Sequence, residues 1–242
     1  MSRLLLNLDA GEGVLAPALE ADLIARADIV NLALGGHAGE PGLTRSLAAQ
    51  ARDAGCEVCL HPGYPDRANF GRRDAPMPWV ELEGSLDAQR AILPEVSWCK
   101  LHGSLYHHAA SDDTLAATLV AWHLRQGIQT VLAPPDGAFT NRAAAAGLCV
   151  LREVFGDRAY GLVGGKLSLL PRGTSGAVLS DAASVVRQIR SLLRGTIPLA
   201  DGSEQPLQGQ TVCIHGDHPT AFENVKAVRQ LLDAEAGGSE PL

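Results

Sequence analysis

The architecture is decided by one stretch, CLHPGYPDR at residues 59–67, where a short apolar run stops at His61. Pro62, Gly63 and Pro65 prevent a strand or helix from continuing past that point. The loop that follows, up to Arg73, holds one Tyr, one Asp, three Arg and one Phe. A loop with so many chemically capable groups is expected to carry function rather than only to connect two elements.

The same pattern, an apolar strand that ends at polar residues beside a glycine, recurs along the chain. Seven strands are predicted at residues 4–9, 29–33, 57–60, 96–100, 130–133, 149–153 and 211–214, with helices between them. Such alternation predicts a parallel sheet covered by helices, and right-handed crossovers bring all strand ends to one side. The polar ends are Asp9 and Glu12, His37, His61, Lys100 and His102, Asp136, Glu153 and Asp157, and His215 and Asp217.

These polar ends are spread evenly over the seven strands, which favours a single-domain α/β fold over residues 1–242, a seven-stranded β/α barrel in which they meet at one mouth. A doubly wound open sheet would spread them along an edge. Ser111 and Asp181 are the expected N-caps of two of the helices. Residues 161–180 are interpreted as an irregular insertion, either a hairpin or an excursion over the site, and residues 237–242 as a frayed tail.

Composition narrows the class of protein. The net charge of −7, with no basic cluster beyond Arg72 and Arg73, disfavours binding to nucleic acid or to acidic membrane surfaces. No apolar run approaches the roughly 20 residues that cross a bilayer. The N-terminus turns polar at Asn7, too early for a signal peptide. We therefore expect a cytoplasmic protein that acts on a small molecule.

The five cysteines, Cys56, Cys59, Cys99, Cys149 and Cys213, are odd in number and lie in or beside apolar runs. This favours reduced core thiols over a disulfide framework. Cys56 and Cys59 form a C-x-x-C motif, but one such motif without a second pair is a weak signal for zinc. Because alternate strand residues face opposite sides, the two thiols are expected to point apart.

Four histidines at four strand ends, His37, His61, His102 and His215, each have a glycine within two residues, and this repetition favours a functional role. Asp9, Glu12, Asp157 and Asp217 add carboxylates, although Asp217 just before Pro219 could simply cap a helix. Two chemistries stay open: a divalent metal that activates water, or metal-free general acid–base catalysis at a carbonyl. No H-E-x-x-H signature is present, so the metal-free chemistry is favoured and a divalent metal is kept as the alternative. The remaining histidines, assigned to packing or solvent, are His107, His108, His123 and His218.

Lys100 ends an apolar strand, and burial there would lower its pKa and produce a base or a cation that polarises a carbonyl. The alternative is a structural partner for Glu153 or Asp157. Arg72, Arg73 and Arg158 suit a substrate carboxylate, which a guanidinium binds bidentately. Residues 161–168, GLVGGKLS, do not fit the spacing of a phosphate-binding P-loop, so the chain shows no nucleotide motif of its own.

These motifs resemble the LamB/YcsF family, whose members are the A-type subunits of 5-oxoprolinase. The resemblance covers nearly the whole chain in the right order, at LNLDAGE (6–12), NLALGGHAG (31–39), HPGYPD (61–66), FGRR (70–73), KLHGSLY (100–106), EVFGDRAY (153–160) and HGD (215–217). It implies a β/α barrel related to the glycoside hydrolase/deacetylase group. It also implies ATP-dependent opening of the 5-oxo-L-proline lactam to L-glutamate, together with two partner subunits of the B and C types, with self-association left open.

Carried over by motif, the resemblance implies a catalytic set and a substrate-binding set. The catalytic candidates are Asp9, Glu12, His37, His61, Lys100, His102, Asp157, His215 and Asp217, and the substrate-binding candidates are Tyr64, Arg72, Arg73, Tyr106 and Arg158. The chain departs from the family pattern at positions expected to line the pocket, namely Leu8, Leu34, Gly36, Leu101 and Gly156. Two alternatives follow: a stand-alone metal-dependent deacetylase or amidohydrolase, and a non-catalytic regulatory subunit.

Overall fold

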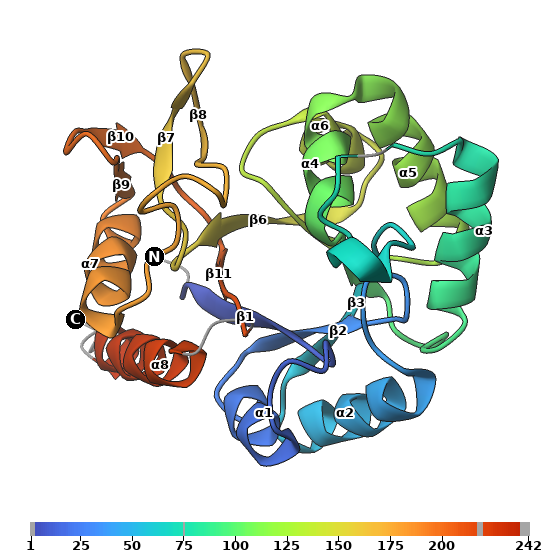
Figure 1. The fold of residues 1–242 in the computed structure, drawn as a ribbon, viewed down its shortest axis with the longest axis horizontal. Coiled ribbons are helices and arrows are strands. Elements are labelled where there is room, and N and C mark those ends of the chain that lie inside the picture. Colours follow the sequence, from blue (N-terminus) through green and yellow to red (C-terminus); the bar gives the residue numbers. More distant parts are fainter. Residues whose placement is uncertain (1–2, 75, 217–219, 238–242) are drawn as a thin grey trace.

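In the computed structural model, which describes residues 3–74, 76–216 and 220–237, seven parallel strands close into a barrel (Figure 1). Around the barrel the strands follow the order β1-β11-β6-β5-β4-β3-β2. The predicted seven-stranded β/α barrel is therefore confirmed. The strands are β1 (Leu5–Ala10), β2 (Ile29–Ala33), β3 (Glu57–His61), β4 (Trp98–Lys100), β5 (Thr130–Ala133), β6 (Cys149–Phe155) and β11 (Thr211–Ile214).

The strand registers show which residues of neighbouring strands face the barrel lumen together. Asn7 is paired with Cys213 on one side and Ile29 on the other, and Asp9 is paired with Asn31. Since side chains alternate across a strand, every second residue of each strand faces the barrel lumen. The lumen therefore holds both polar residues, such as Asn7 and Asp9, and a small apolar cluster around Ile29. That cluster contains Ile29, Cys59 and Leu132, with Leu5, Trp98 and Leu151 packed against it.

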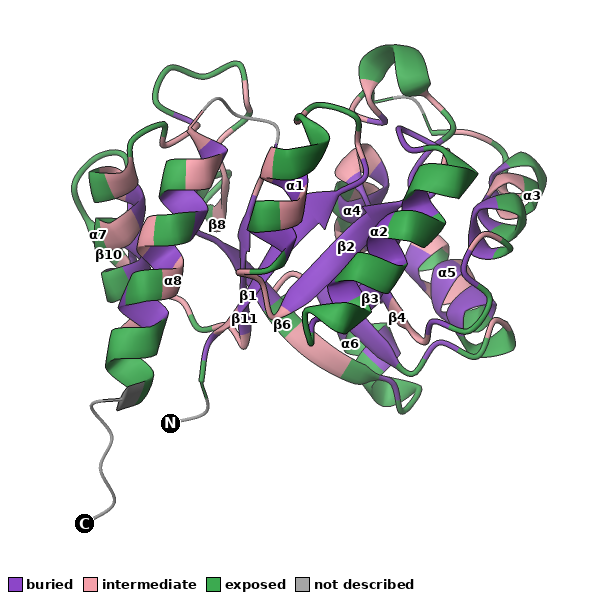
Figure 2. Ribbon diagram, turned by 90° about the horizontal axis from the view of Figure 1, so that it is seen from below, coloured by how far each residue is buried: buried purple, intermediate pink, exposed green. Residues whose placement is uncertain are grey.

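The helices cover the outside of the barrel, with their buried faces toward the strands and their exposed faces toward solvent (Figure 2). Most of the apolar core lies in this layer between strands and helices, and Trp122 is its largest fully buried side chain. Within the described ranges no helix is long and apolar enough to cross a bilayer. The helices are α1 (Pro17–Ile24), α2 (Pro41–Asp53), α3 (Trp79–Arg90), α4 (Gly103–Ser111), α5 (Asp113–Arg125), α6 (Ala138–Ala145), α7 (Ala182–Leu193) and α8 (Ala221–Gly237), with a short 3-10 turn at Arg67–Asn69.

The chain between β6 and β11 departs from simple alternation of strands and helices. It forms an antiparallel hairpin of β7 (Tyr160–Val163) and β8 (Lys166–Leu169), then α7, then a second pair, β9 (Thr196–Pro198) and β10 (Glu204–Pro206). The second pair has no counterpart in the sequence-based prediction. Both lie outside the barrel, on one side of it (Figure 1). The tail at 237–242 lies outside the described residues except for Gly237, which ends α8.

Of the two predicted helix caps, one differs from the structure and one agrees with it. Helix α4 begins directly after His102, so Ser111 is the last residue of α4 rather than a cap. The cap of α5 is Asp112, whose carboxylate accepts hydrogen bonds from the backbone N–H groups of Thr114 and Leu115 at 2.9 and 3.0 Å. Asp181 caps α7 as predicted, since its carboxylate accepts from the Ser184 N–H at 2.8 Å.

All five cysteines are free thiols, and four of them are buried. Cys149 is exposed at the start of β6, so its assignment to the core was wrong. The C-x-x-C thiols point apart as expected: Cys56 donates to the carbonyls of Ile24 and Ala27 outside the barrel, while Cys59 faces the lumen cluster. Burial raises the pKa of both thiols, which keeps them protonated.

The capping assignment is testable. We expect Asp112→Ala to lower the free energy of unfolding by about 1 kcal/mol, because two backbone N–H groups of α5 lose their acceptor. Ser111→Ala, at the neighbouring position, is the matched control and should change stability by less than about 0.5 kcal/mol. Urea denaturation monitored by circular dichroism measures both. A larger loss in the Ser111 variant would contradict the assignment.

Candidate active site

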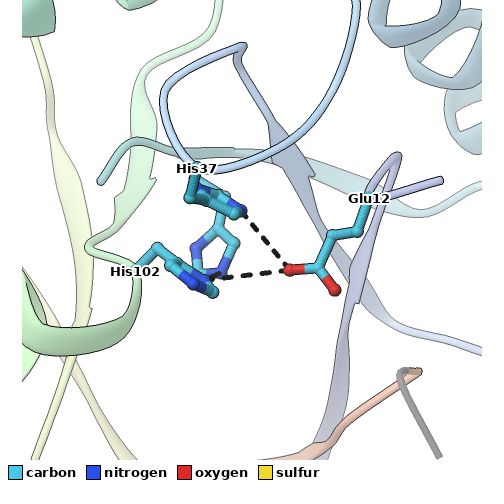
Figure 3. Close-up of side chains that lie close together, drawn as sticks. Glu12, His37 and His102 are labelled. Atoms are coloured by element: carbon cyan, nitrogen blue, oxygen red, sulfur yellow. Dashed lines mark hydrogen bonds and ion pairs between the residues drawn. The ribbon is translucent and has the colours of Figure 1, made fainter. Parts of the chain in front are cut away.

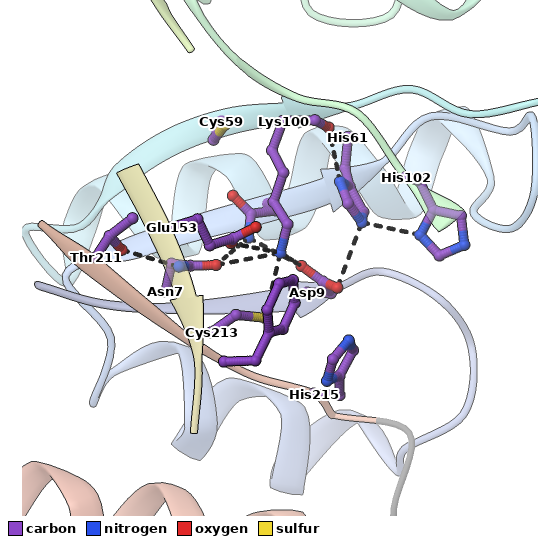
Figure 4. A network of polar contacts seen from close by, with 12 residues as sticks. Asn7, Asp9, Cys59, His61, Lys100, His102, Glu153, Thr211, Cys213 and His215 are labelled. Carbon is purple, nitrogen blue, oxygen red and sulfur yellow. Dashed lines mark hydrogen bonds and ion pairs between the residues drawn. The ribbon is translucent and has the colours of Figure 1, made fainter. Parts of the chain in front are cut away.

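A buried ammonium group lies at the centre of the barrel lumen (Figure 4). Lys100 Nζ on β4 is 2.9 Å from Asp9 Oδ1 on β1 and 2.9 Å from Glu153 Oε1 on β6. It also donates to Asn7 Oδ1 at 3.3 Å and lies 3.2 Å from Cys213 Sγ. None of the strands β1, β4 and β6 adjoins another in the barrel, so this charged cluster connects three separate parts of the wall across the lumen.

Amide side chains hold the carboxylate of Asp9 in place. Asn31 Nδ2 donates to Asp9 Oδ1 at 2.9 Å and to Asn7 Oδ1 at 2.8 Å, while Asn7 Nδ2 donates to Thr211 Oγ1 at 2.8 Å. All four residues are buried. Each of these side chains has a hydrogen-bond partner, which offsets part of the cost of burying it, although Asn31 Oδ1 has none among the described residues.

The pKa shifts follow from this arrangement. Burial alone would raise the pKa of Asp9, but His61 and Lys100 outweigh it and hold that pKa well below its usual value. Burial alone would lower the pKa of Lys100, but Asp9, Cys213 and Glu153 outweigh it and raise that pKa well above its usual value. The expectation of a depressed Lys100 pKa was therefore wrong, because its carboxylate partners decide the sign. Lys100 is a permanent cation and Asp9 a permanent anion at neutral pH.

Three imidazoles gather beside Asp9 at the ends of β2, β3 and β4. His61 Nε2 lies 3.4 Å from Asp9 Oδ2 and 3.0 Å from His102 Nδ1. The ring of His37 stacks on that of His102, with centroids 3.5 Å apart and planes 6° apart. Glu12, in the loop after β1, approaches His37 Nε2 at 3.4 Å and His102 Nδ1 at 3.8 Å. The predicted catalytic residues Asp9, Glu12, His37, His61 and His102 are thus brought together.

His215 and Asp157 form a separate pair on the other side of Asp9. The Asp157 carboxylate accepts from the His215 backbone N–H at 2.8 Å, and both of its oxygens lie 3.0 Å from His215 Nδ1. Burial would raise the pKa of Asp157, but contact with His215 outweighs it and keeps the carboxyl ionised. The ring of Phe155 stacks on the imidazole, at 13°. Asp157 therefore orients His215 through Nδ1, and within the described residues no hydrogen bond of Nε2 is recorded.

A cavity of about 380 Å³ opens above these groups. Asp9, His61 and Lys100 lie at its polar end, and the hairpin residues Leu169 to Arg172 line another side. The guanidinium groups of Arg72, Arg158 and Arg172 also line it. Burial and the neighbouring arginines lower the pKa of Arg158 to about 10, so the three like charges lie close enough to repel one another. The lining residues not yet named include His102, Tyr106, His107 and His215.

Some predicted site residues lie away from this cavity. Tyr64 is buried and forms a hydrogen bond with His108 Nδ1 at 2.9 Å, and neither it nor Arg73 lines the cavity. The side chain of Arg73 is 63% exposed and faces Asp66. Asp136 is exposed and accepts from the Gly137 N–H. Asp217, a predicted catalytic residue, lies outside the described residues.

The departures from the family pattern mostly lie elsewhere too. Leu101 alone of the five is among the residues lining the cavity. Leu8 and Leu34 belong to the core between barrel and helices, because Leu8 occupies an outward position of β1. A side chain at Gly36 would meet Gln89, and one at Gly156 would meet Ile214. The expectation that all five line the pocket was therefore wrong.

Sequence reasoning missed several members of the site. Asn7 and Asn31 are lone polar residues inside apolar strands, at inward positions, and this signal was present in the sequence. Glu153 was considered only as a partner of Lys100, and it is one. Arg172 reaches the cavity on the hairpin insertion, and no periodic pattern points to it. His107, assigned to solvent or packing, lines the cavity although it is exposed.

Comparison with known proteins places the chain in a family. The model of the LamB/YcsF family matches residues 4–242. The chain belongs to the LamB/YcsF family. Among its relatives, the 5-oxoprolinase A subunit of Streptomyces griseus is 36% identical over 244 residues, with 96% of each chain covered. That of Heliobacterium modesticaldum is 36% identical and covers 96% of this chain and 94% of its own length.

A solved structure of a lactam utilization protein has the same fold over the same length. This protein, from Thermus thermophilus, superimposes with a TM-score of 0.83 at 30% identity, covering 97% of each chain. The match includes the barrel together with the insertion between β6 and β11. The fold described above is therefore shared by the two proteins along nearly their whole length.

The buried ion cluster gives a stability prediction. We expect Lys100→Met to lower the free energy of unfolding by about 3–5 kcal/mol at pH 7, since two buried carboxylates lose their cation. Lys166→Met, at an exposed lysine of the β7–β8 hairpin, is the matched control and should change it by less than about 0.5 kcal/mol. Chemical denaturation measures both. Equal losses in the two variants would show that the ion pairs of Lys100 do not contribute to the free energy of unfolding.

Proposed function

We propose that this chain is the A-type component of an ATP-dependent 5-oxoprolinase, which opens the lactam of 5-oxo-L-proline to L-glutamate together with two partner subunits of the B and C types. The observation that carries the proposal is the cavity itself, in which paired acid–base groups at one end are combined with arginines at the wall. A lactam that carries a carboxylate needs both: groups that move protons at the amide and a cation that binds the carboxylate. The names of the relatives point to the same substrate class.

The His215–Asp157 pair is assigned to proton transfer. A histidine whose Nδ1 is held by a buried carboxylate presents Nε2 as a general base and stabilises the imidazolium that forms. His215 lines the cavity, so Nε2 can reach a water molecule or the ring nitrogen of a bound lactam. This assignment needs no change in the ionisation of Asp157, which stays charged.

Lys100 is assigned a supporting role instead of a catalytic one. Its ammonium group has three protons, and four acceptors already surround it. A substrate carbonyl would therefore have to displace one of them. Lys100 keeps Asp9 ionised, and Asp9 in turn faces His61 Nε2 at 3.4 Å. Polarisation of the lactam carbonyl falls to the His61 and His102 side of the cavity.

ATP is assigned to the complex as a whole. The chain has no nucleotide-binding motif, and residues 161–168 form the β7–β8 hairpin rather than a loop that leads into a helix. The relatives are named as one lettered subunit of 5-oxoprolinase, which implies partner subunits in those proteins. We accordingly place the phosphate chemistry with the partners and the acid–base chemistry of ring opening with this chain.

The proton-transfer assignment predicts a large loss of activity in His215→Asn. The Asn amide can still donate to Asp157 in place of Nδ1, but Nε2 is gone, so kcat for glutamate release should fall about 10²–10⁴-fold. The assay uses this chain with its B- and C-type partners, 5-oxoproline and ATP. The matched control is His108→Asn, at a half-buried histidine outside the cavity, which should retain activity. Full activity of the His215 variant would refute the assignment.

The assignment of Arg72 to the substrate carboxylate predicts different effects of substitution at Arg72 and at its neighbour Arg73. Arg72 lines the cavity whereas Arg73 is exposed beside Asp66, so Arg72→Gln should raise KM for 5-oxoproline about tenfold or more while Arg73→Gln leaves it unchanged. 2-Pyrrolidinone, which has the lactam but lacks the carboxylate, supplies the second readout. If it is turned over, its KM should be the same in both variants. Equal KM values for 5-oxoproline would contradict the role of Arg72.

One observation favours a second candidate, a metal-dependent amidohydrolase that acts alone. Glu12, His37, His61 and His102 place one ligand atom each within 4.8 Å of one another. Glutamate release by this chain with Zn²⁺, in the absence of ATP and partners, would establish that function and overturn the proposed one. Strict dependence on ATP and on the partners would favour the proposal.

A further inference from the structure

Phe70, in the loop after β3, has a backbone conformation that a bulky residue rarely adopts. Its φ is 56° and its ψ is 34°, in the left-handed region, and no other non-glycine residue of the described chain has a positive φ. In this region the Cβ crowds the neighbouring backbone, so that glycine or asparagine is the usual occupant. Such a conformation persists in a bulky residue only where surrounding contacts hold it, and it concentrates at functional sites.

Contacts on both sides of Phe70 hold this conformation. Its backbone N–H donates to the carbonyl of Arg67 at 3.2 Å and closes the short 3-10 turn. The carbonyl of the next residue, Gly71, accepts from the backbone N–H of Ser104 on α4 at 3.0 Å. Gly71 has no room for a side chain, since a Cβ there would lie 2.8 Å from His37 Cβ. The loop is therefore fixed against the site on either side of the Phe70 side chain.

The left-handed conformation directs the carbonyl of Phe70 toward an imidazole of the site. The carbonyl oxygen lies 2.9 Å from His102 Nε2. Because a carbonyl oxygen only accepts, Nε2 of His102 is the donor and carries a proton. Nδ1 of the same ring then faces His61 Nε2 at 3.0 Å, on the side of the cavity assigned above to the lactam carbonyl. The backbone of Phe70 thus determines which nitrogen of His102 points into the site.

The ring of Phe70 packs against two imidazoles of the site. His37 and His102 stack on each other beside Glu12, as Figure 3 shows. The Phe70 ring meets both of them edge-on, with its centroid 5.5 Å from that of His37 and 5.6 Å from that of His102. The interplanar angles of 70° and 75° are those of the favourable edge-to-face arrangement of aromatic rings.

The same ring carries a guanidinium group of the cavity wall. Cζ of Arg72 lies 4.7 Å from the Phe70 centroid, inside the range of about 6 Å in which a cation is attracted to an aromatic face. Arg72 also lines the cavity. A long side chain that is already ordered loses less conformational entropy when it binds a ligand. Glycine would close the turn with less strain, but it would offer Arg72 no such surface.

We propose that Phe70 is a positioning residue that aligns the two sides of the cavity with each other. Its ring orders the guanidinium of Arg72, which is assigned to the substrate carboxylate, and its carbonyl fixes the tautomer of His102. The strained backbone is what allows one residue to make both contacts. The effect on 5-oxoproline rests on the proposed function, whereas the two contacts themselves do not.

NMR of the full chain without partners tests the contact with Arg72. An aromatic ring shifts the signals of protons above its face upfield, so the side-chain protons of Arg72 report whether the ring lies beneath them. We expect these signals to move downfield in Phe70→Leu, which removes the aromatic face, and to stay in place in Phe70→Tyr. Unchanged Arg72 signals in Phe70→Leu would overturn the proposal.

The matched control for this experiment is Phe222→Leu. Phe222, half-buried on α8, also lies beneath a guanidinium, with Arg26 Cζ 5.6 Å from its centroid, but it does not line the cavity. This variant should move the signals of Arg26 and leave those of Arg72 unchanged. Circular dichroism of all variants shows whether each is folded, so that a shifted signal is not confused with unfolding.

The histidine signals of the same samples test the contact of the carbonyl. ¹⁵N spectra should show the proton of His102 on Nε2 in the unmodified chain and also in Phe70→Leu, because the backbone carbonyl is present in both. The signal is assigned by its loss in His102→Gln. A neutral His102 with its proton on Nδ1 alone would overturn this half of the proposal.

Kinetics with the B- and C-type partners test the consequence for the substrate. We expect Phe70→Leu to raise KM for 5-oxoproline about 3–10-fold with little change in kcat, and Phe70→Tyr to restore it. The inhibition constant of 2-pyrrolidinone, which lacks the carboxylate, should be unchanged. Adding Phe70→Leu to Arg72→Gln should raise KM no further, because the ring acts through Arg72.

The double variant distinguishes positioning from a general structural effect. Additive increases in KM would overturn the proposal, as would equal weakening of 5-oxoproline and 2-pyrrolidinone in Phe70→Leu. If the NMR signals behave as expected but the assembled complex does not turn over 5-oxoproline, the proposed function fails. The positioning of Arg72 and His102 by Phe70 would then still stand.

Discussion

The ammonium group of Lys100, buried in the barrel lumen, is the constraint on which the rest of the site depends. A charge in this position is tolerable only with its counterions close by, and those come from β1 and β6, neither of which adjoins β4. The pairing therefore specifies how three separated parts of the barrel wall must face one another. Placing Asp9 next to Lys100 also brings it against His61, so the same interaction that organises the lumen organises the polar end of the cavity.

Main-chain atoms and a carboxylate position three of the histidines. His61 and His102 each use one nitrogen on a backbone carbonyl, and His215 uses one on Asp157. In each case the contact of one ring nitrogen fixes the orientation of the imidazole, and the other ring nitrogen faces the site. Such fixed donors and acceptors need little reorganisation during a reaction, which is the usual source of catalytic advantage in buried sites.

Strand periodicity and strand-end chemistry were enough to predict the barrel, because each strand–helix unit has the same local pattern and right-handed crossovers leave few topologies. The same logic brought His61, His102 and His215 to one cavity. Finer features depended on which way a side chain points. Counting alternate positions from Asp9 would have placed Asn7 inside and Leu8 outside the lumen.

Other features depend on tertiary contacts that no local pattern reports. The sign of the Lys100 pKa shift follows from two carboxylates that are distant in sequence. Arg172 enters the cavity through the packing of a hairpin against the barrel, and Asp112 replaces Ser111 as a cap because a helix not anticipated, α4, ends there. Tyr64 and Arg73 belong to the decisive loop, yet the loop turns them away from the cavity.

The hairpin of β7 and β8 is inserted between two strands, β6 and β11, that pair directly with each other. The barrel closes through that pairing, so its integrity does not require the hairpin. Residues 169–172 nevertheless form part of the cavity wall. Changes in hairpin length or composition can thus alter the width and charge of the entrance at small thermodynamic cost. Substitutions in the hairpin can therefore change which ligand the cavity prefers, while the ion pairs of Lys100 keep the residues of the barrel lumen in place.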